Sequence, residues 1–394
     1  MDYNASTPLA DDVLEGMLPY LSGSFGNASS RHDYGRVARS AIDDARQRVA
    51  DALGAHPTEV IFTSGGTEAN NLFIKGVCAL KKPGTVIISS VEHPCVREPA
   101  RQIAASGWAL RELAADVDGV IEQSEFRQVV SGIADGEHIV VSVMHANNET
   151  GVMQDVAALA VELKAIQSKR GLRSGGGEAR FHTDAVQVFG KGVLNFRELN
   201  ASGVHALTVS AHKIGGPKGV GALVLDKRVE LQTLLAGGGH ERGIRSGTEN
   251  VAAIVGFGLA AEKLNGALAE RSSKTLALRN ELERGLLAMN AILFGAGAER
   301  LPNTCYFALP GIDGETLVGR LDREGFAVAS GAACSSVNPE PSYVLMAMGV
   351  ESELARGAVR VSLGTGNTQQ QVRDFLSALS VTRSKLLNMS ALLN

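Results

Sequence analysis

The sequence has few cysteines, few aromatic residues and no strong excess of either charge. Its 394 residues include four cysteines without a CxxC pair, too few for a disulfide framework, so we expect reduced thiols in the cytoplasm. The net charge of -4 indicates neither direct nucleic-acid binding nor a membrane surface. No run approaches the ~18 apolar residues of a membrane span, and MDYNASTPLADDV lacks the features of a secretory signal. These absences favour a soluble, unprocessed enzyme with a small-molecule substrate.

The chain is long enough for two domains, and its first two thirds alternate strand-like and helical patterns. Apolar residues recur at helical spacing over 37–53 and 154–169. Short β-rich runs occur at 85–90, 138–145, 179–184, 206–212 and 221–226. This alternation predicts an α/β domain with a mostly parallel sheet.

A second, smaller α+β domain is expected in the last third. A helical pattern begins after Asn250, and strand-like runs follow at 303–309, 326–330 and 357–363. The opening residues MDYNASTP have the pattern of an extended arm that returns to this domain. The glycine-rich stretch 171–180, around Gly175, is expected to form a surface loop between a helix and a strand.

Polar residues close several of the predicted strands. The segments SVEH, HANNE, HTDAVQ and SAHK each place His, Asn, Asp or Lys where a strand gives way to a loop. Ligands of parallel sheets gather at the carboxyl ends of the strands. The pattern therefore predicts one shared site at that edge.

A glycine-rich turn follows the strand-like segment EVIF and has the pattern of a phosphate cradle. Gly66 lets the backbone approach an anion, Thr67 adds a hydroxyl donor, and the following helix begins with free N–H groups. A turn of this kind is about as often a simple connection between a strand and a helix.

The strand ends also carry groups suited to pyridoxal-phosphate chemistry. Lys213 could form a Schiff base, and Asp184 could pair with a pyridinium nitrogen. A solvated lysine and a helix-capping aspartate are the alternatives. His93 could stack on a planar cofactor or move protons, and Asn148 could donate to a phenolic oxygen. Hydrogen-bonded packing and a stabilised turn are the structural alternatives for these two residues.

The ordered motifs make the sequence similar to the cysteine desulfurases, and in particular to their iron-sulfur-cluster assembly branch. SGAACSS distinguishes this branch from relatives whose cysteine lies in an RxGHHC-type segment. The resemblance implies a fold-type I pyridoxal-phosphate transferase with a seven-stranded, mostly parallel sheet. It rests on DYNASTP, FGNASSRHDYG, FTSGGTEANN, EHPCV, HANNETG, HTDAVQ, SAHKIGGPKG, GGGHERGIRSGTEN, SGAACSS, EPSYVLMAMG and VRVSLG.

By this resemblance, pyridoxal 5′-phosphate is the cofactor and Lys213 carries it. Asp184 would pair with the ring nitrogen, and His93 would stack on the ring as a third catalytic residue beside Lys213 and Cys334. Thr248 would reach the phosphate of the other subunit, which implies a homodimer. Asn148 and Gln187 would contact the phenolic oxygen, while Gly66, Thr67, Ser210 and His212 would hold the phosphate. No metal is expected.

The resemblance also assigns the substrate side of the site. Arg360 would clamp the carboxylate of L-cysteine, with Asn148 as a second contact. Cys334 lies in a small-residue, proline-containing segment typical of a mobile loop; its thiolate would attack the substrate sulfur, leaving alanine and a persulfide. The other cysteines, Cys78, Cys95 and Cys305, are interpreted as small packed hydrophobes.

Together these assignments define two units. Residues 14–255 would form the large cofactor domain, and residues 1–13 with 256–394 the small domain that carries the cysteine loop. The sulfur acceptor stays open among a cluster scaffold, a tRNA-thiolation protein and a DNA-phosphorothioation protein. A selenocysteine lyase, an aminotransferase and a non-catalytic sulfur-transfer adaptor are the alternative functions; transamination does not call for a cysteine on a loop such as SGAACSS.

Overall fold

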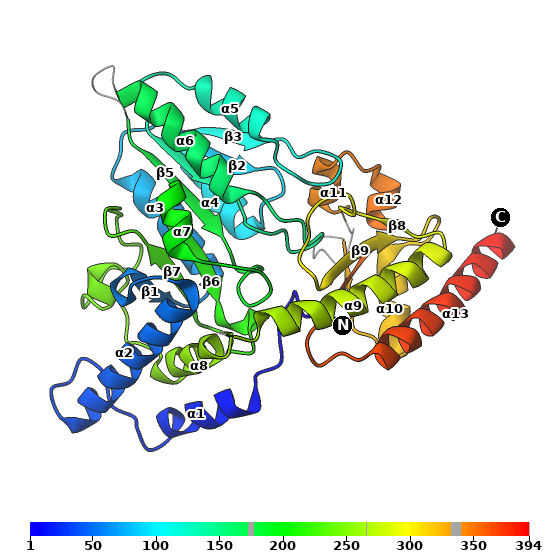
Figure 1. Cartoon of the computed structure of the whole chain (residues 1–394), viewed down its shortest axis with the longest axis horizontal. Helices are drawn as coiled ribbons and strands as arrows, with labels where there is room; N and C mark the ends of the chain where they lie inside the picture. The colour runs from blue at the N-terminus through cyan, green and yellow to red at the C-terminus, as the bar shows by residue number, and fades with distance from the viewer. Residues whose placement is uncertain (172–176, 265, 332–339, 394) are drawn as a thin grey trace.

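The computed structural model describes residues 1–171, 177–264, 266–331 and 340–393 and contains two sheets (Figure 1). The larger has seven strands in the order β1-β7-β6-β5-β4-β2-β3, and the smaller has four in the order β10-β11-β9-β8. The strands of the larger sheet are β1 (Val60–Thr63), β2 (Thr85–Ser89), β3 (Ala109–Leu113), β4 (Ile139–Ser142), β5 (Ala179–Asp184), β6 (Ala206–Ser210) and β7 (Gly221–Leu225). All neighbours are parallel except that β7 runs antiparallel to both β1 and β6. The predicted α/β fold with a mostly parallel sheet is confirmed.

Helices cover both faces of the larger sheet because its strands are apolar on both sides. Along β2, Val86 and Ile88 belong to one hydrophobic cluster and Ile87 to the other. Alternate residues of a strand point to opposite faces, so continuous apolar runs produce two buried faces. The helices of this part are α1 (Asp11–Leu21), α2 (Asp33–Leu53), α3 (Gly66–Ala79), α4 (Pro94–Ala105), α5 (Gln123–Ser131), α6 (Val156–Gly171), α7 (Phe196–Ser202) and α8 (Val251–Glu262).

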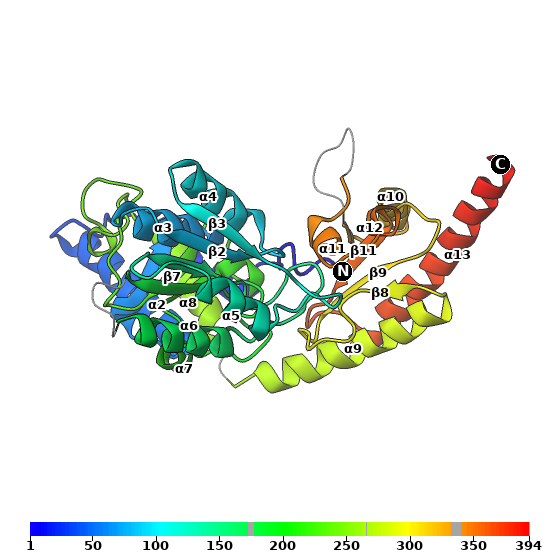
Figure 2. The same ribbon diagram turned by 90° about the horizontal axis from the view of Figure 1, so that it is seen from above.

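The smaller sheet is antiparallel and has its own core. Leu282 of α9 and Phe375 of α13 join Phe307 and Val359 in one buried cluster. Helix α9 leads from the region beside the larger sheet to the smaller one (Figures 1 and 2). The elements of this part are α9 (Leu268–Ala288), β8 (Ile292–Leu293), β9 (Thr304–Ala308), α10 (Gly314–Arg323), β10 (Ala329–Ser330), α11 (Tyr343–Ala347), α12 (Ser352–Arg356), β11 (Ala358–Ser362) and α13 (Gln369–Leu393).

The opening residues form the predicted extended arm. Asp2 bridges to Ser362 at the end of β11, and the Thr7 amide donates to the His212 carbonyl at 2.8 Å. The arm therefore contacts both parts of the molecule. The division at residues 255 and 256 falls within α8, which packs against α1 and α2, and the proposed domain limits stay a prediction.

Two differences from the sequence analysis concern strands, and the first has a clear cause. Strand β3 was missed because it is an edge strand whose Arg111 and Glu112 are exposed, so its sequence lacks an apolar run. The run predicted at 326–330 is a strand only at Ala329–Ser330. Residues 172–176 of the glycine-rich stretch, which include Gly175, lie outside the described residues. Among the helices the structure describes, none is long and apolar enough to cross a membrane.

Candidate active site

The predicted polar residues meet at one edge of the larger sheet. Strands β2, β4, β5 and β6 are adjacent and parallel, so their carboxyl ends lie together. Asp184 and Ser210 are the last residues of β5 and β6, and both are buried. His93 and Asn148 follow β2 and β4 after short connections. The sheet topology therefore confirms the shared edge that the strand endings predicted.

The two carboxylate oxygens of Asp184 accept hydrogen bonds from different groups: one from a nearby backbone amide and the other from a side chain of α3. Its Oδ1 accepts a hydrogen bond from the Val186 amide at 3.0 Å, in a turn rather than at the start of a helix. Its Oδ2 accepts from Asn70 Nδ2 of α3 at 2.7 Å. Asn70 was not singled out from the sequence, although it lies within TSGGTEANN. This pair keeps a buried carboxylate oriented at the sheet edge.

Cys95 belongs to this cluster, which corrects its interpretation as a packed hydrophobe. Its Sγ lies 2.9 Å from His93 Nδ1, 3.0 Å from Asn70 Nδ2 and 3.8 Å from Asp184 Oδ2. Burial and the Asp184 charge raise the pKa of this thiol, so it stays protonated. Cys78 and Cys305, by contrast, are packed in hydrophobic cores as predicted. His93 is thus fixed by Cys95, whose backbone amide it also caps.

Lys213 ends the short 3-10 helix η2 (Ala211–Lys213), which directly follows β6. Its Nζ donates to the backbone carbonyls of Asn4 and Ala5 in the amino-terminal arm. Burial, and secondarily the Arg360 charge, lower the pKa of Lys213 to about 8. A neutral amine is the nucleophilic form, so these surroundings prepare Lys213 for covalent chemistry at near-neutral pH.

A second lysine, Lys191, forms a hydrogen bond to the amino-terminal arm that also contacts Lys213. Lys191 Nζ donates to Gln187 Oε1 at 2.6 Å and to Asn4 Oδ1 at 2.9 Å. Gln187 Nε2 in turn donates to the Asn4 carbonyl at 3.1 Å. Burial and the charges of Lys213 and Arg360 lower the pKa of Lys191 well below its usual range. Neither Asn4 nor Lys191 was predicted, because each gains its partners only when distant segments meet.

Arg360 enters the site from β11 of the smaller sheet. Its Nη1 donates to the Asn148 carbonyl at 2.9 Å, and its Nη2 pairs with Asp2 Oδ1 at 2.7 Å. Two buried atoms here, Arg360 Nε and Asn148 Oδ1, have no hydrogen-bond partner among the described residues. Buried polar groups are normally paired, so these atoms indicate that a polar ligand completes the site.

The other end of the site has the features of a phosphate cradle. Helix α3 begins at Gly66 and Thr67 without a side-chain cap, so its first N–H groups are left for a ligand. A Cβ on Gly66 would lie 3.0 Å from Val186 and 4.0 Å from the Ser210 Cβ. The absence of a side chain at Gly66 therefore keeps space open between α3 and the end of β6.

His212 and Thr248 are the other two residues that the resemblance assigns to a phosphate group. His212 Nδ1 lies 3.3 Å from Ser6 Oγ, and burial together with Lys213 lowers the pKa of His212 to about 4, so its ring is neutral. Thr248 is exposed and borders a separate cavity of about 200 Å³ with Thr63 and Ser64. Cys334 lies outside the described residues.

Taken together, the edge fits a planar, phosphate-bearing cofactor. It offers an open helix start at Gly66, a buried carboxylate at Asp184, an amine of lowered pKa at Lys213 and a ring at His93. These are the groups that pyridoxal phosphate requires for its phosphate, its ring nitrogen, its covalent link and one ring face.

The chain is similar to proteins of known class over nearly its whole length. Residues 1–375 match the family described as aminotransferase class-V. A cysteine desulfurase IscS from Dictyoglomus turgidum is 39% identical, covering 99% of this chain and 95% of that protein. Two solved structures are also similar: a NifS-like protein (34% identity, TM-score 0.88, covering 97% of this chain and 98% of that one) and SspA in complex with cysteine (32%, 0.78, 93% and 99%).

Proposed function

This chain belongs to the aminotransferase class-V family and is a pyridoxal-phosphate-dependent cysteine desulfurase, and we propose that Lys213 carries the cofactor while Cys334 receives the sulfur of L-cysteine. The observation that carries the proposal is the position of Lys213. It lies at the carboxyl edge of the sheet, within electrostatic reach of Asp184 and Arg360, with its pKa lowered to about 8. When bound, the cofactor supplies an electron sink that stabilises negative charge on the amino-acid carbon.

The residues of the large sheet edge would hold the cofactor. The N–H groups at Gly66 and Thr67, with Ser210 and His212, are assigned to the phosphate. Asp184 would pair with the ring nitrogen, fixed by Asn70 at 2.7 Å. His93 would stack on one face of the ring, and its imidazole is oriented for this by Cys95. Gln187 and Asn148 would contact the phenolic oxygen.

Arg360 would recognise the carboxylate of the substrate. Its guanidinium is held by the Asn148 carbonyl and Asp2, which fixes the direction of its remaining donors. The unpartnered Arg360 Nε and Asn148 Oδ1 are free for the substrate carboxylate and ammonium. The neutral amine of Lys213 is able to accept the α-proton of cysteine bound there.

Cys334 would then take the sulfur. Its thiolate forms a bond to the substrate sulfur, the bond between that sulfur and Cβ breaks, and the electron pair remains on the carbon. A proton added to that carbon yields alanine, and Cys334 is left as a persulfide that can be passed to an acceptor. A cluster scaffold, a thiolation protein and a phosphorothioation protein are the candidate acceptors.

A homodimer is supported by an exposed apolar surface on the first two helices. Leu18 and Leu21 of α1 and Phe25 in the following loop are 51%, 62% and 75% exposed, and Phe25 stacks on Tyr34 with ring centroids 5.2 Å apart. Contiguous apolar patches on soluble proteins mark association sites. Thr248, itself exposed, would reach the phosphate of the partner subunit. We place the dimer in the cytoplasm, where reducing conditions preserve a reactive thiol.

The proposal is tested by supplying L-cysteine alone to the purified yellow protein. Equal amounts of alanine and sulfide, released in the presence of a thiol reductant, are expected. An aminotransferase would need a keto acid and would retain the sulfur in its product, and a sulfur-transfer adaptor would be colourless and would not turn over. Comparing selenocysteine with cysteine at equal concentration distinguishes a selenocysteine lyase.

A further inference from the structure

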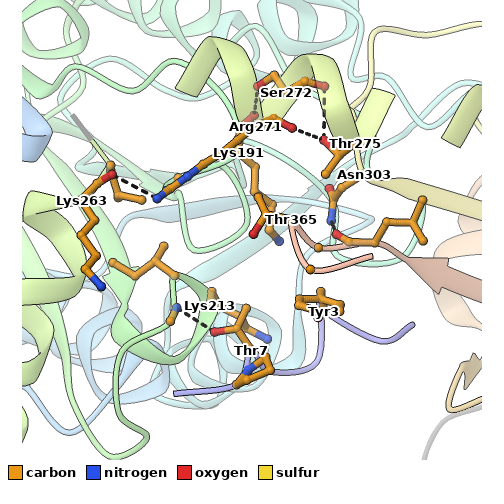
Figure 3. Close-up of a pocket in the computed structure, with 18 of the residues that line it drawn as sticks. Tyr3, Thr7, Lys191, Lys213, Lys263, Arg271, Ser272, Thr275, Asn303 and Thr365 are labelled. Atoms are coloured by element: carbon orange, nitrogen blue, oxygen red, sulfur yellow. Dashed lines mark hydrogen bonds between the residues drawn. The ribbon is translucent and has the colours of Figure 1, made fainter. Parts of the chain in front are cut away.

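A cavity of about 370 Å³ lies behind the arm that contacts Lys213, between the parts of the molecule that carry the two sheets (Figure 3). Lys191, Lys213 and Lys263 approach it from segments of the larger part. The first turns of α9 contribute Arg271 and Ser272, and Thr365 follows β11 of the smaller sheet. Its size is that of a site for a small molecule.

The lining of this cavity is basic, and its positive charge comes mainly from Lys263 and Arg271. Four basic side chains line it, and no aspartate or glutamate occurs among its described lining residues. Lys263 pairs with Asp12, which does not line the cavity. Arg271 forms no ion pair within the part of the chain that the structure describes, and it donates to the Lys263 carbonyl at 3.1 Å. Lys191 contacts only amide oxygens, and burial lowers its pKa well below the usual range, so its charged form is disfavoured. Cations without acidic partners in a partly buried cavity favour an anionic ligand.

Among the described residues, the remaining wall contains neutral polar side chains and no competing negative charge. Ser272 and Thr275 project from the same face of α9, and their hydroxyls donate to the carbonyls of Lys191 and Arg271 at 3.2 and 2.8 Å. The Ser272 bond joins α9 to the segment that follows β5, whereas the Thr275 bond lies within α9. Helix α9 begins at Leu268 without a side-chain cap, so the positive end of its dipole faces the region where the basic residues gather.

We propose that this cavity binds a small anion with at least two carboxylate or phosphate groups, held by Arg271 and Lys263. Arg271 and Lys263 are not among the residues assigned to the cofactor, and the Nζ of Lys213, which also lines the cavity, is bonded to the carbonyls of Asn4 and Ala5. The ligand would bridge α9 and the segments beside the larger sheet, so its binding would strengthen the contact between the two parts.

Calorimetric titration of the cofactor-loaded enzyme with citrate and with pyrophosphate tests the proposal, because the cofactor already fills the other phosphate site. We expect at least one of them to bind with a Kd below about 1 mM at physiological ionic strength. Arg271→Gln should weaken that binding about tenfold or more, since a charge-assisted hydrogen bond is lost. Arg284→Gln is the matched control, because Arg284 is an exposed arginine of the same helix outside the cavity.

The two probes distinguish the ligand classes: preference for citrate indicates a polycarboxylate, and preference for pyrophosphate indicates a phosphate ester. Lys263→Gln provides a second variant if Arg271→Gln unfolds at lower temperature than the wild type. The proposal is overturned if neither probe binds to the wild type, or if either folded variant binds as tightly as Arg284→Gln.

Discussion

The two sheets contribute different kinds of charged group to one site. The edge of the larger sheet supplies titratable groups whose pKa values are lowered: Lys213 to about 8 and His212 to about 4. The smaller sheet supplies Arg360, a permanent cation held in place by Asp2 and by the Asn148 carbonyl. From this difference we propose a division of labour, in which the larger sheet would bind the cofactor and move protons while the smaller one would select the substrate.

Of the changes considered, removing Lys213 from the edge of the larger sheet should have the largest effect on activity. Lys213→Ala should abolish covalent attachment of the cofactor and lower turnover by about 10³-fold or more, because the nucleophilic amine is lost. Borohydride reduction of the wild type followed by peptide mapping should label Lys213. A modified lysine elsewhere would overturn this assignment, with Lys191 as the neighbouring alternative to inspect.

Changing Arg360 should affect the substrate and spare the cofactor. Arg360→Gln should lower kcat/KM for cysteine by about 10²-fold, mostly through KM, because a charged partner of the carboxylate is lost. Arg360→Lys should recover only part of this loss, since lysine cannot donate in two parallel directions. Steady-state kinetics with the visible absorbance as a measure of cofactor content checks both. Loss of the cofactor in either variant would contradict the division between the sheets.

The pH dependence of cofactor capture should reveal the lowered pKa of Lys213. With a pKa of about 8, roughly one tenth of the amine is neutral at pH 7, so the rate of attachment to apoenzyme should rise about tenfold and level off above pH 8. An ordinary lysine would give a rate that still rises at pH 10. Arg360→Gln should shift the midpoint upward, because the Arg360 charge contributes to lowering this pKa. Stopped-flow absorbance measures these rates.

An effect on stability rather than on turnover is expected at Glu92, which is buried near Asp184 and whose pKa burial raises to about 8. Its Oε1 accepts from Ser89 and from the Met144 amide at 2.6 Å, while Oε2 has no partner among the described residues. The folded state favours the protonated acid, so stability should be greatest below about pH 4.5 and should fall as the pH rises to about 8.

Glu92→Gln removes this ionisation while keeping an acceptor for both bonds. At pH 8 the variant should be more stable than the wild type by about 4 kcal/mol, and the difference should fall to about 1 kcal/mol near pH 5, because the pKa is raised from 4.5 to about 8. Urea unfolding at both pH values measures it. Equal stability of the two proteins at pH 8 would show that Glu92 is ionised without penalty in the fold.

The sequence predicted the parts of the site that lie at strand ends, because a polar residue after an apolar run is visible in one dimension. Asp184 and Ser210 close β5 and β6 as expected, and the arm returns to the smaller sheet. Lys191 and Asn4 could not be found this way, since their partners lie in distant segments. Cys95 was misread because its neighbours in sequence do not reveal that α3 brings Asn70 to its sulfur.

The central claim is that the cofactor activates L-cysteine and that a separate residue, Cys334, accepts its sulfur. The most direct test is to identify which residue of the enzyme carries the transferred sulfur. Wild-type enzyme and Cys334→Ala would each be exposed briefly to L-cysteine and analysed by mass spectrometry of their peptides. We expect one added sulfur atom on the wild-type peptide containing Cys334, and a variant that keeps its cofactor and its spectral response to cysteine but releases almost no sulfide. Release of alanine and sulfide by Cys334→Ala at the wild-type rate would contradict the account and would indicate that the cofactor eliminates the sulfur without a cysteine acceptor.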